Sequence, residues 1–551
     1  MSHLTGKSRE QIRMPSSIEE YVEEYSPVRI IDAFVDTLDM KELGFTKATP
    51  AYTGRPAYAP SDLLKLYIYG YMNKMRSSRR LMTECRRNME VMFLLNELKP
   101  DFRTISDFRK ENPEPIREVF REFVKFCDEF GLFKKELIAI DGTKVRAQNS
   151  DDKCYNKDIL LKKIERIDAH IEEYIGALKR NDESGEDDDD EDDRKPGLEE
   201  IKTGLKTLSE RKDKYVGYLT HLNSSEDTQI LETDPEAHRM HTNNGFHCCY
   251  NIQTAVDSGS HLIAEYEVTS HNTDQGLLNE ICEQAKGTLC LETIEAVADK
   301  GYESRNDILN CIMNGTVPNV GLKYDRDERI FNLEYEETAN VEDLKNSTTP
   351  EDIAKCIRAG VLPNCYEGTA VSVELQELSA LSCFIRNDND TVTCPMGVTL
   401  TKLKTKGQNT EYANKDACRQ CKNRCTDSAT NKRVSFGPEA KYVAVLMYGS
   451  PRHNLNEIPD DFVCHNSFNR KDKQKKRVVI RLREDKEKLK RRMCTVEHPF
   501  GSVKWYGDAG YVLCRGKRKV SAEIGLSFLG YNIKRAIKMI GTEELLKKLG
   551  A

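Results

Sequence analysis

The first 135 residues carry apolar side chains at the three- and four-residue steps that are typical of amphipathic helices. Residues 61–98 and 102–133 both show this spacing, interleaved with arginine, lysine and methionine. From residue 137 the pattern changes to short β-branched runs bounded by glycine, aspartate or serine, which indicate buried strands. We therefore expect an all-helical segment over residues 1–135, followed by a domain built on a sheet.

Strand and helix patterns alternate beyond residue 137. Residues 250–270 predict two strands joined at "DSGS", a hairpin signal, and other short apolar runs begin near residues 137, 294 and 316. Helical spacing recurs over residues 273–287, 305–314 and 517–540. The order strand, hairpin, helix, strand, helix, strand predicts an α/β fold, a mixed sheet with helices packed on it.

Two insertions interrupt this order. In residues 156–222, apolar residues recur at steps of three and four on both sides of an acidic run, which predicts a helical hairpin with a solvated, disordered loop at its tip. A later segment contains clustered cysteines. The expected organisation is a helical domain over 1–135, a sheet domain assembled from 136–155, 235–325 and 482–545, a helical hairpin over 156–234, and a cysteine-rich insertion over 326–481.

Charge is spread unevenly along the 551 residues, although the net charge is only −7. The run Asp182–Asp193 holds much of the negative charge, whereas Asn469–Met493 contains 13 Lys/Arg against 4 Asp/Glu. Such asymmetry favours a polyanionic partner. The arginines of the helical domain belong either to the surface of a plain bundle or to a DNA-binding face: Arg76, Arg79, Arg80, Arg86 and Arg87.

The 18 cysteines are numerous for a chain in which we see no secretory signal and no apolar run long enough to span a membrane. We expect a cytoplasmic protein whose cysteines are thiols or metal ligands. Four of them form a C-x2-C-x3-C cluster with one cysteine upstream, which suits a structural Zn²⁺ site, the alternative being unliganded thiols: Cys394, Cys418, Cys421 and Cys425.

Three carboxylates stand out by their context. Asp141 and Asp299 each end a short apolar run and are followed closely by glycine, while Glu497 lies alone in a basic segment. A strand-end aspartate is also a common turn residue. Two aspartates in the same context, together with Glu497, favour a site for two hard cations, which Mg²⁺ fills with few carboxylates plus water and phosphate oxygens. The chemistry predicted is phosphoryl transfer on a nucleic-acid backbone.

Four motifs together resemble the DDE transposases of bacterial insertion sequences: "IDGTKVRAQNS", "YNIQTAVD", "ADKGYES" and "TVEHPFGSVK". The N-terminal stretch from "GRPAYAPSDLLKLYIYGYM" to "PDFRTISDFRKEN" resembles the helical domain that precedes catalysis in that group. The likeness covers roughly residues 50–150, 235–325 and 490–540. It implies an RNase H-like catalytic domain, interrupted by long insertions, in a bacterial protein associated with the nucleoid.

The resemblance makes Asp141, Asp299 and Glu497 the ligands of two Mg²⁺ ions, with Mn²⁺ able to substitute. It implies endonuclease and strand-transfer activity on double-stranded DNA, the terminal inverted repeats and the target, by a homodimer. Related enzymes carry a Tyr-x2-Arg-x3-Glu-x6-Lys signature, in which Lys504 takes the lysine position. The first half departs, because Lys490 and Met493 occupy the tyrosine and arginine positions. Arg491 or Arg492 is then expected to hold DNA phosphates.

Two alternatives to an active transposase remain open, a catalytically inactive DNA-binding regulator descended from one and another two-metal DNA nuclease. Seven residues separate Glu497 from Lys504, about two helical turns, so both would share a face. Pro499 argues against one unbroken helix. We favour a helix that starts anew with Thr495 as N-cap over one that kinks at Pro499. Trp505, the only tryptophan, either packs or stacks on an unpaired base.

Overall fold

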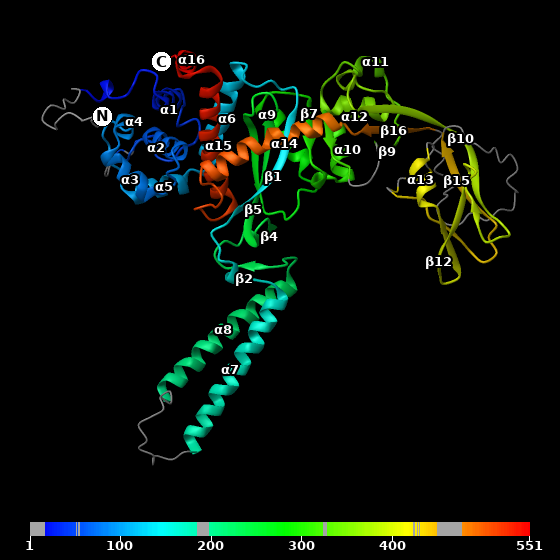
Figure 1. The fold of residues 1–551 in the computed structure, drawn as a ribbon, viewed down its shortest axis with the longest axis horizontal. Coiled ribbons are helices and arrows are strands. Elements are labelled where there is room, and N and C mark those ends of the chain that lie inside the picture. The colour runs from blue at the N-terminus through cyan, green and yellow to red at the C-terminus, as the bar shows by residue number, and fades with distance from the viewer. Residues whose placement is uncertain are drawn as a thin grey trace, which may run out of the picture.

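The computed structural model describes residues 17–50, 52, 56–183, 198–322, 328–421, 425–426, 428, 430–448 and 476–550. Its N-terminal part is helical, as predicted (Figure 1). Local signals set the helix starts: Ser26 and Asp101 each accept backbone N–H groups of the first turn that follows. The helices of this part are α1 (Pro27–Asp36), α2 (Pro60–Met72), α3 (Ser78–Arg87), α4 (Met89–Leu94), α5 (Phe102–Glu111) and α6 (Pro113–Glu129).

The central sheet is mixed, as the alternating pattern predicts. Its strand order is β4-β5-β1-β7-β8, and β6 pairs with β5. Strand β1 is antiparallel to β5 and parallel to β7, and β7 is parallel to β8. The strands are β1 (Ile138–Arg146), β4 (His238–Thr242), β5 (Gly245–Asp257), β6 (Ile263–Thr269), β7 (Ile294–Ala298) and β8 (Thr316–Val320), and the intervening helices are α9 (Leu278–Thr288) and α10 (Arg305–Met313).

Three C-terminal helices complete this unit: α14 (Lys486–Gly501), α15 (Lys517–Ile540) and α16 (Thr542–Leu549). Helix α14 runs across the sheet and contacts β1, β5 and β7 (Figure 1). Helix α15 packs against α2, α6 and β6, so it joins the helical part to the sheet. Among the described helices, none has the length and apolarity of a membrane span.

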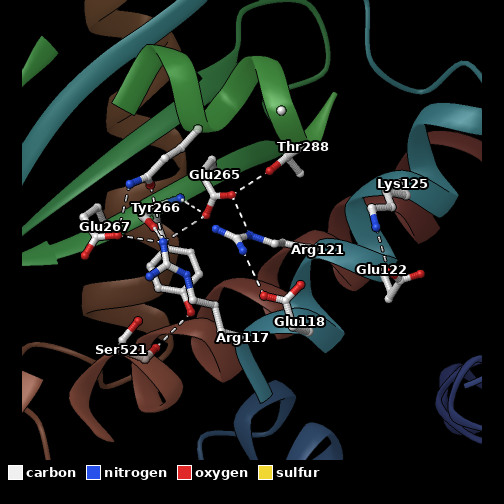
Figure 2. A network of polar contacts seen from close by, with 12 residues as sticks. Arg117, Glu118, Arg121, Glu122, Lys125, Glu265, Tyr266, Glu267, Thr288 and Ser521 are labelled. Carbon is white, nitrogen blue, oxygen red and sulfur yellow. Dashed lines mark hydrogen bonds and ion pairs between the residues drawn. The ribbon is translucent and has the colours of Figure 1, made fainter. Parts of the chain in front are cut away.

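A buried ionic network ties α6 to β6 (Figure 2). Arg121 Nε lies 2.9 Å from Glu265 Oε2, and Thr288 Oγ1 donates to the same oxygen at 2.6 Å. Arg117 Nη2 lies 2.7 Å from Glu267 Oε2. Glu265 is fully buried, and a buried carboxylate is tolerated only when such partners replace its hydration. The network therefore fixes the helical part against the sheet.

The first insertion is a two-helix arm formed by α7 (Lys157–Glu183) and α8 (Leu198–Ser224), and it extends away from the sheet (Figure 1). The arm has its own small core near its base, where β2 (Cys154–Tyr155) pairs with β3 (Ile230–Leu231). The predicted solvated loop lies largely outside the described residues, since residues 184–197 are not among them.

The second insertion contains a sheet that the sequence analysis missed. Its described strands run in the order β14-β13-β12-β11-β10-β16-β9, with β15 paired to β10. Exposed charged residues on strands such as β12 (Thr399–Lys406) hid the alternation that would indicate a strand. The other strands are β9 (Glu328–Glu334), β10 (Val371–Arg386), β11 (Val392–Thr393), β13 (Asn409–Ala413), β14 (Val434–Phe436), β15 (Tyr442–Tyr448) and β16 (Lys476–Arg483), and the helices are α11 (Val341–Leu344), α12 (Pro350–Arg358) and α13 (Lys415–Gln420).

Candidate active site

Asp141 lies on β1, and Asp299 directly follows the parallel neighbouring strand β7. The register pairs Ile138 with Ala296 and Ala139 with Val297, and carried forward it sets Asp141 beside Asp299. Adjacent strands lie about 4.8 Å apart, so the two carboxylates share one edge of the site. Asp141 does not end its strand as predicted, because β1 continues against β5 to Arg146, but its neighbour β7 ends one residue before Asp299.

The Asp141 carboxylate is largely enclosed. Burial raises its pKa to about 6, opposed by the nearby Arg492 guanidinium and reinforced by the charge of Asp299. Arg492 Nη1 lies 2.9 Å from Asp141 Oδ2. Asp299 Oδ1 accepts the backbone N–H of Gly301 at 2.7 Å, which leaves its second oxygen free of that bond. Two acids crowded in this way favour a cation between them.

A third aspartate, Asp274, borders this pair and was missed by the sequence analysis. Its Oδ1 accepts from Asn251 Nδ2 and Gln253 Nε2, both at 2.8 Å, and the Tyr302 hydroxyl donates to Gln253 Oε1. A side chain at Gly142 would collide with Asp274, which explains the glycine after Asp141. A signal was present in the sequence, because the amides Asn251 and Gln253 alternate with Tyr250 and Ile252 in the buried part of β5.

Helix α14 presents Arg492 to the site. Asp485 caps the helix by accepting the N–H groups of Glu487 and Lys488, and Lys488 Nζ lies 2.6 Å from Glu295 Oε1 on β7. Four residues later, Arg492 reaches Asp141 from the same face of the helix. The neighbouring Arg491 is exposed and donates to Ser258 Oγ at 3.2 Å. Of the two arginines expected to hold DNA phosphates, Arg492 is therefore engaged by an acid.

Glu497 is not beside the two aspartates. It follows Arg492 by five residues, which turns it about 140° round the helix, and its side chain is exposed. In the part of the chain that the structure describes, no three His, Cys, Asp or Glu side chains are grouped so as to hold a metal ion. The role of Glu497 as third ligand stays a prediction.

Pro499 lies within helix α14. The helix starts after Asp485 and not at Thr495, so the favoured alternative of a new helix was wrong. Proline has no N–H to donate to the carbonyl four residues earlier, that of Thr495. His261 Nδ1 lies 3.3 Å from this oxygen and supplies the missing partner.

Lys504 follows α14 in a π-helical turn, Ser502–Tyr506 (η6). Its Nζ donates to the Lys144 carbonyl of β1 at 2.9 Å, and burial lowers the pKa of Lys504 against the opposing effects of Cys249 and Asp141. Lys504 is half-buried whereas Glu497 is exposed, and the shared face of these two residues stays a prediction. The Trp505 side chain lies outside the described residues.

The arginines of the helical part divide into two kinds. Arg79 and Arg80 on α3 are exposed, and the Arg79 guanidinium lies 5.2 Å from the Phe102 ring centre. Arg76, in contrast, is buried, donates to the Tyr511 carbonyl at 2.7 Å and pairs with Glu523 at 3.4 Å. Arg76 therefore lies neither on a bundle surface nor on a DNA-binding face, because its charge pairs with Glu523 of α15 inside the protein.

The four clustered cysteines lie in the second insertion. Cys394 opens a tight turn in which the Val398 N–H donates to its sulfur at 3.4 Å. Cys394 and Cys425 pack against the same small core of this insertion. Burial raises the pKa of the Cys425 thiol to about 11 against the opposing charge of Lys432, and Cys418, Cys394 and Cys421 add to the rise. No three of them close into a metal-binding group in the described residues.

Comparison with known proteins adds one match at the N-terminus. Residues 16–111 match the family described as Transposase domain (DUF772). No curated protein matches. Among solved structures, the chain is similar to the "Cryo-EM structure of piggyBac transposase synaptic complex with hairpin DNA (SNHP)", at 9% identity and a TM-score of 0.27, over 96% of this chain and 76% of that chain. Through residues 16–111, the chain is therefore similar to proteins that carry a transposase domain.

Proposed function

We propose that the protein is a DDE transposase of a bacterial insertion sequence, with an RNase H-like catalytic domain. The observation that carries the proposal is the placement of Asp141 on β1 beside Asp299, which directly follows the parallel neighbour β7, in a chain whose N-terminal region matches a transposase domain. The strand order β6-β5-β1-β7-β8, three antiparallel strands followed by two parallel ones, supports this fold.

Asp141 and Asp299 would hold Mg²⁺, or Mn²⁺ in its place, since carboxylate oxygens are the ligands these ions prefer. The ions would supply activation of water or a 3′-hydroxyl and stabilisation of the leaving oxygen. The Asp141 carboxylate is largely shielded from water. Asn251 and Gln253 hold Asp274 in place by donating hydrogen bonds to its carboxylate. Glu497 completes the proposed ligand set because of its place in the motif, although the face of α14 that meets Asp141 carries Arg492.

The proposed partner is double-stranded DNA, the terminal inverted repeats and the target, bound by a homodimer at the nucleoid of a bacterial cytoplasm. Arg79, Arg80 and Arg491 are exposed cations suited to phosphate contacts. Lys504 is held close to Asp141, where it can meet a phosphate of the reacting strand.

Strand cleavage of DNA that carries the element's ends tests the proposal. Asp141→Asn, Asp299→Asn and Glu497→Gln should each lower Mg²⁺-dependent cleavage by roughly 100-fold or more, the scale of losing several kcal/mol of transition-state stabilisation. Glu487→Gln, an exposed acid in the first turn of the same helix, is the matched control. A carboxylate whose replacement keeps full activity is misassigned, and cleavage of branched DNA without end sequence would instead show another two-metal nuclease.

One observation favours a second candidate, an inactive DNA-binding regulator. Arg492 occupies Asp141 Oδ2 and Glu497 faces solvent, so the structure presents an ion pair where a metal site is proposed. Specific binding of end DNA without cleavage in either Mg²⁺ or Mn²⁺ would establish that candidate.

We also propose structural Zn²⁺ bound by Cys394, Cys418, Cys421 and Cys425. The turn after Cys394, with a backbone N–H aimed at the sulfur, and the shared core of Cys394 and Cys425 support it. Metal analysis of the reduced protein should find about one zinc per chain, and Cys418→Ser should lose it, with Cys290→Ser, an exposed cysteine elsewhere, as control. A zinc-free reduced protein would end the proposal.

A further inference from the structure

A groove of about 570 Å³ lies beside Asp141, between β1, the β4–β5 hairpin and the turn after α14. Figure 1 shows these strands at the end of the sheet from which the two-helix arm departs. Alternate residues of β1 point to one face, which brings Gly142, Lys144 and Arg146 into the same wall. Lys504 lines the groove from the other side, and Asp274 marks the end nearest to Asp141.

The three cations of this groove have neutral partners. Lys144 Nζ donates to the His241 carbonyl at 2.7 Å, and Lys504 Nζ donates to the Lys144 carbonyl at 2.9 Å. Among the described residues, no carboxylate forms an ion pair with Lys144, Arg146 or Lys504. Arg492, a cation near the groove, differs from these three because it forms an ion pair with Asp141. The groove therefore carries three cations that form no ion pair with a described carboxylate, although Asp274 lines its end.

Arg146 is held in place without losing its charge. Its Nη2 lies 2.6 Å from His247 Nε2, and because a guanidinium only donates, the imidazole accepts at this nitrogen. His247 Nδ1, 2.8 Å from Asp151 Oδ2, then carries the hydrogen and donates to that carboxylate. These two hydrogen bonds orient Arg146 through Nη2, and the exposed guanidinium has further N–H groups with which to bind an anion.

We propose that this groove binds the phosphodiester backbone of the DNA strand that passes Asp141 and Asp299, with Lys144 and Arg146 as phosphate contacts. The inference rests on the proposed function and adds a subsite to it. Lys144 and Arg146 are two residues apart on one strand, about 6.7 Å, so they meet successive positions along a bound backbone. Contacts of this kind position DNA and do not select its sequence.

Salt-dependent DNA binding by the full chain tests the subsite. Each phosphate contact contributes about 0.9 to the slope of log K against log salt for duplex DNA, and about 0.7 for a single strand. Arg146→Gln should lower the slope by about one such unit and weaken binding several-fold at low salt, equally for end DNA and unrelated DNA. Lys144→Gln should act alike, and Arg146→Lys should restore the slope because it keeps the charge.

Arg358→Gln is the matched control, since Arg358 is an exposed arginine paired with Glu336 at 2.9 Å far from the groove. The subsite is refuted if Arg146→Gln and Lys144→Gln have the melting temperature of the wild type and also its slope of log K against log salt. This conclusion would hold even if the wild type cleaves DNA. A reduced slope in a protein that never cleaves would support the subsite and count only against the catalytic proposal.

Discussion

The Arg492 guanidinium lies 2.9 Å from the Asp141 carboxylate, so a residue expected to bind DNA instead neutralises the first predicted metal ligand. Both side chains are mostly shielded from water, at 16% and 24% exposure, so the lost hydration of the two charges offsets their attraction. A cation that binds Asp141 must compete with Arg492 for the same oxygen.

Removal of this competitor should strengthen metal binding. Arg492→Gln is expected to lower the Mn²⁺ concentration for half-saturation of the DNA-free protein by roughly tenfold, the equivalent of about 1.4 kcal/mol. Titration calorimetry measures the change. Lys488→Gln is the control, because Lys488 lies one turn earlier on the same face and pairs with Glu295. Weaker Mn²⁺ binding by Arg492→Gln would show that Arg492 supports the site.

The charge of Asp141 should cost stability in the metal-free protein. Its folded pKa of about 6 exceeds the value of about 3.9 for an exposed aspartate, so the folded state binds more protons between about pH 4 and pH 6. Stability is therefore lost as pH rises through that window and stays lower above it.

Asp141→Asn, which cannot ionise, should be more stable than the wild type at pH 8 by about 3 kcal/mol and equal to it near pH 4. Urea unfolding at both pH values provides the measurement. The opposite sign is expected for Asp485→Asn at pH 8, since backbone N–H groups of α14 lower the pKa of Asp485. Equal stability of Asp141→Asn and wild type at pH 8 would contradict the burial of this charge.

We expect His261 to stabilise the protein, because Pro499 has no N–H to donate to the Thr495 carbonyl and His261 donates to it instead. His261→Asn removes the donor to the Thr495 carbonyl and keeps a residue that tolerates the left-handed backbone at position 261, where φ is +60°. We expect a loss of about 1 kcal/mol in the free energy of unfolding. In a Pro499→Ala background the helix can supply its own N–H, so the same change should cost less. A double-mutant cycle with no coupling would refute the relationship.

The network of Figure 2 should dominate the contact between helical part and sheet. Glu265→Ala leaves Arg121 without its buried partner and should destabilise the protein by about 3–5 kcal/mol. Glu122→Ala, which breaks the exposed Glu122–Lys125 pair on the same helix, should cost about 0.5 kcal/mol or less. Chemical unfolding measures the free energy of unfolding of both variants. Similar losses would show that the Glu265 network stabilises the protein no more than a surface ion pair does.

Local signals were enough to predict several parts of the molecule. Helical periodicity located the N-terminal helices, and apolar runs located β1 with Asp141 inside it and β7 with Asp299 directly after it. These features depend on residues that are close in sequence, whose periodicity reports which face of an element is buried. The second sheet escaped because its exposed strands carry charges at positions that would otherwise alternate.

The sequence by itself determined the helical N-terminus, the mixed sheet and the two aspartates that its parallel strands carry side by side. Only the tertiary structure decided which face of α14 meets the sheet. That face carries Lys488 and Arg492, whereas Glu497 is exposed. The tertiary structure also buried Arg76 against Glu523 and brought Asp274 to Asp141. Such choices depend on packing between elements far apart in the chain, where burial and charge pairing outweigh local periodicity.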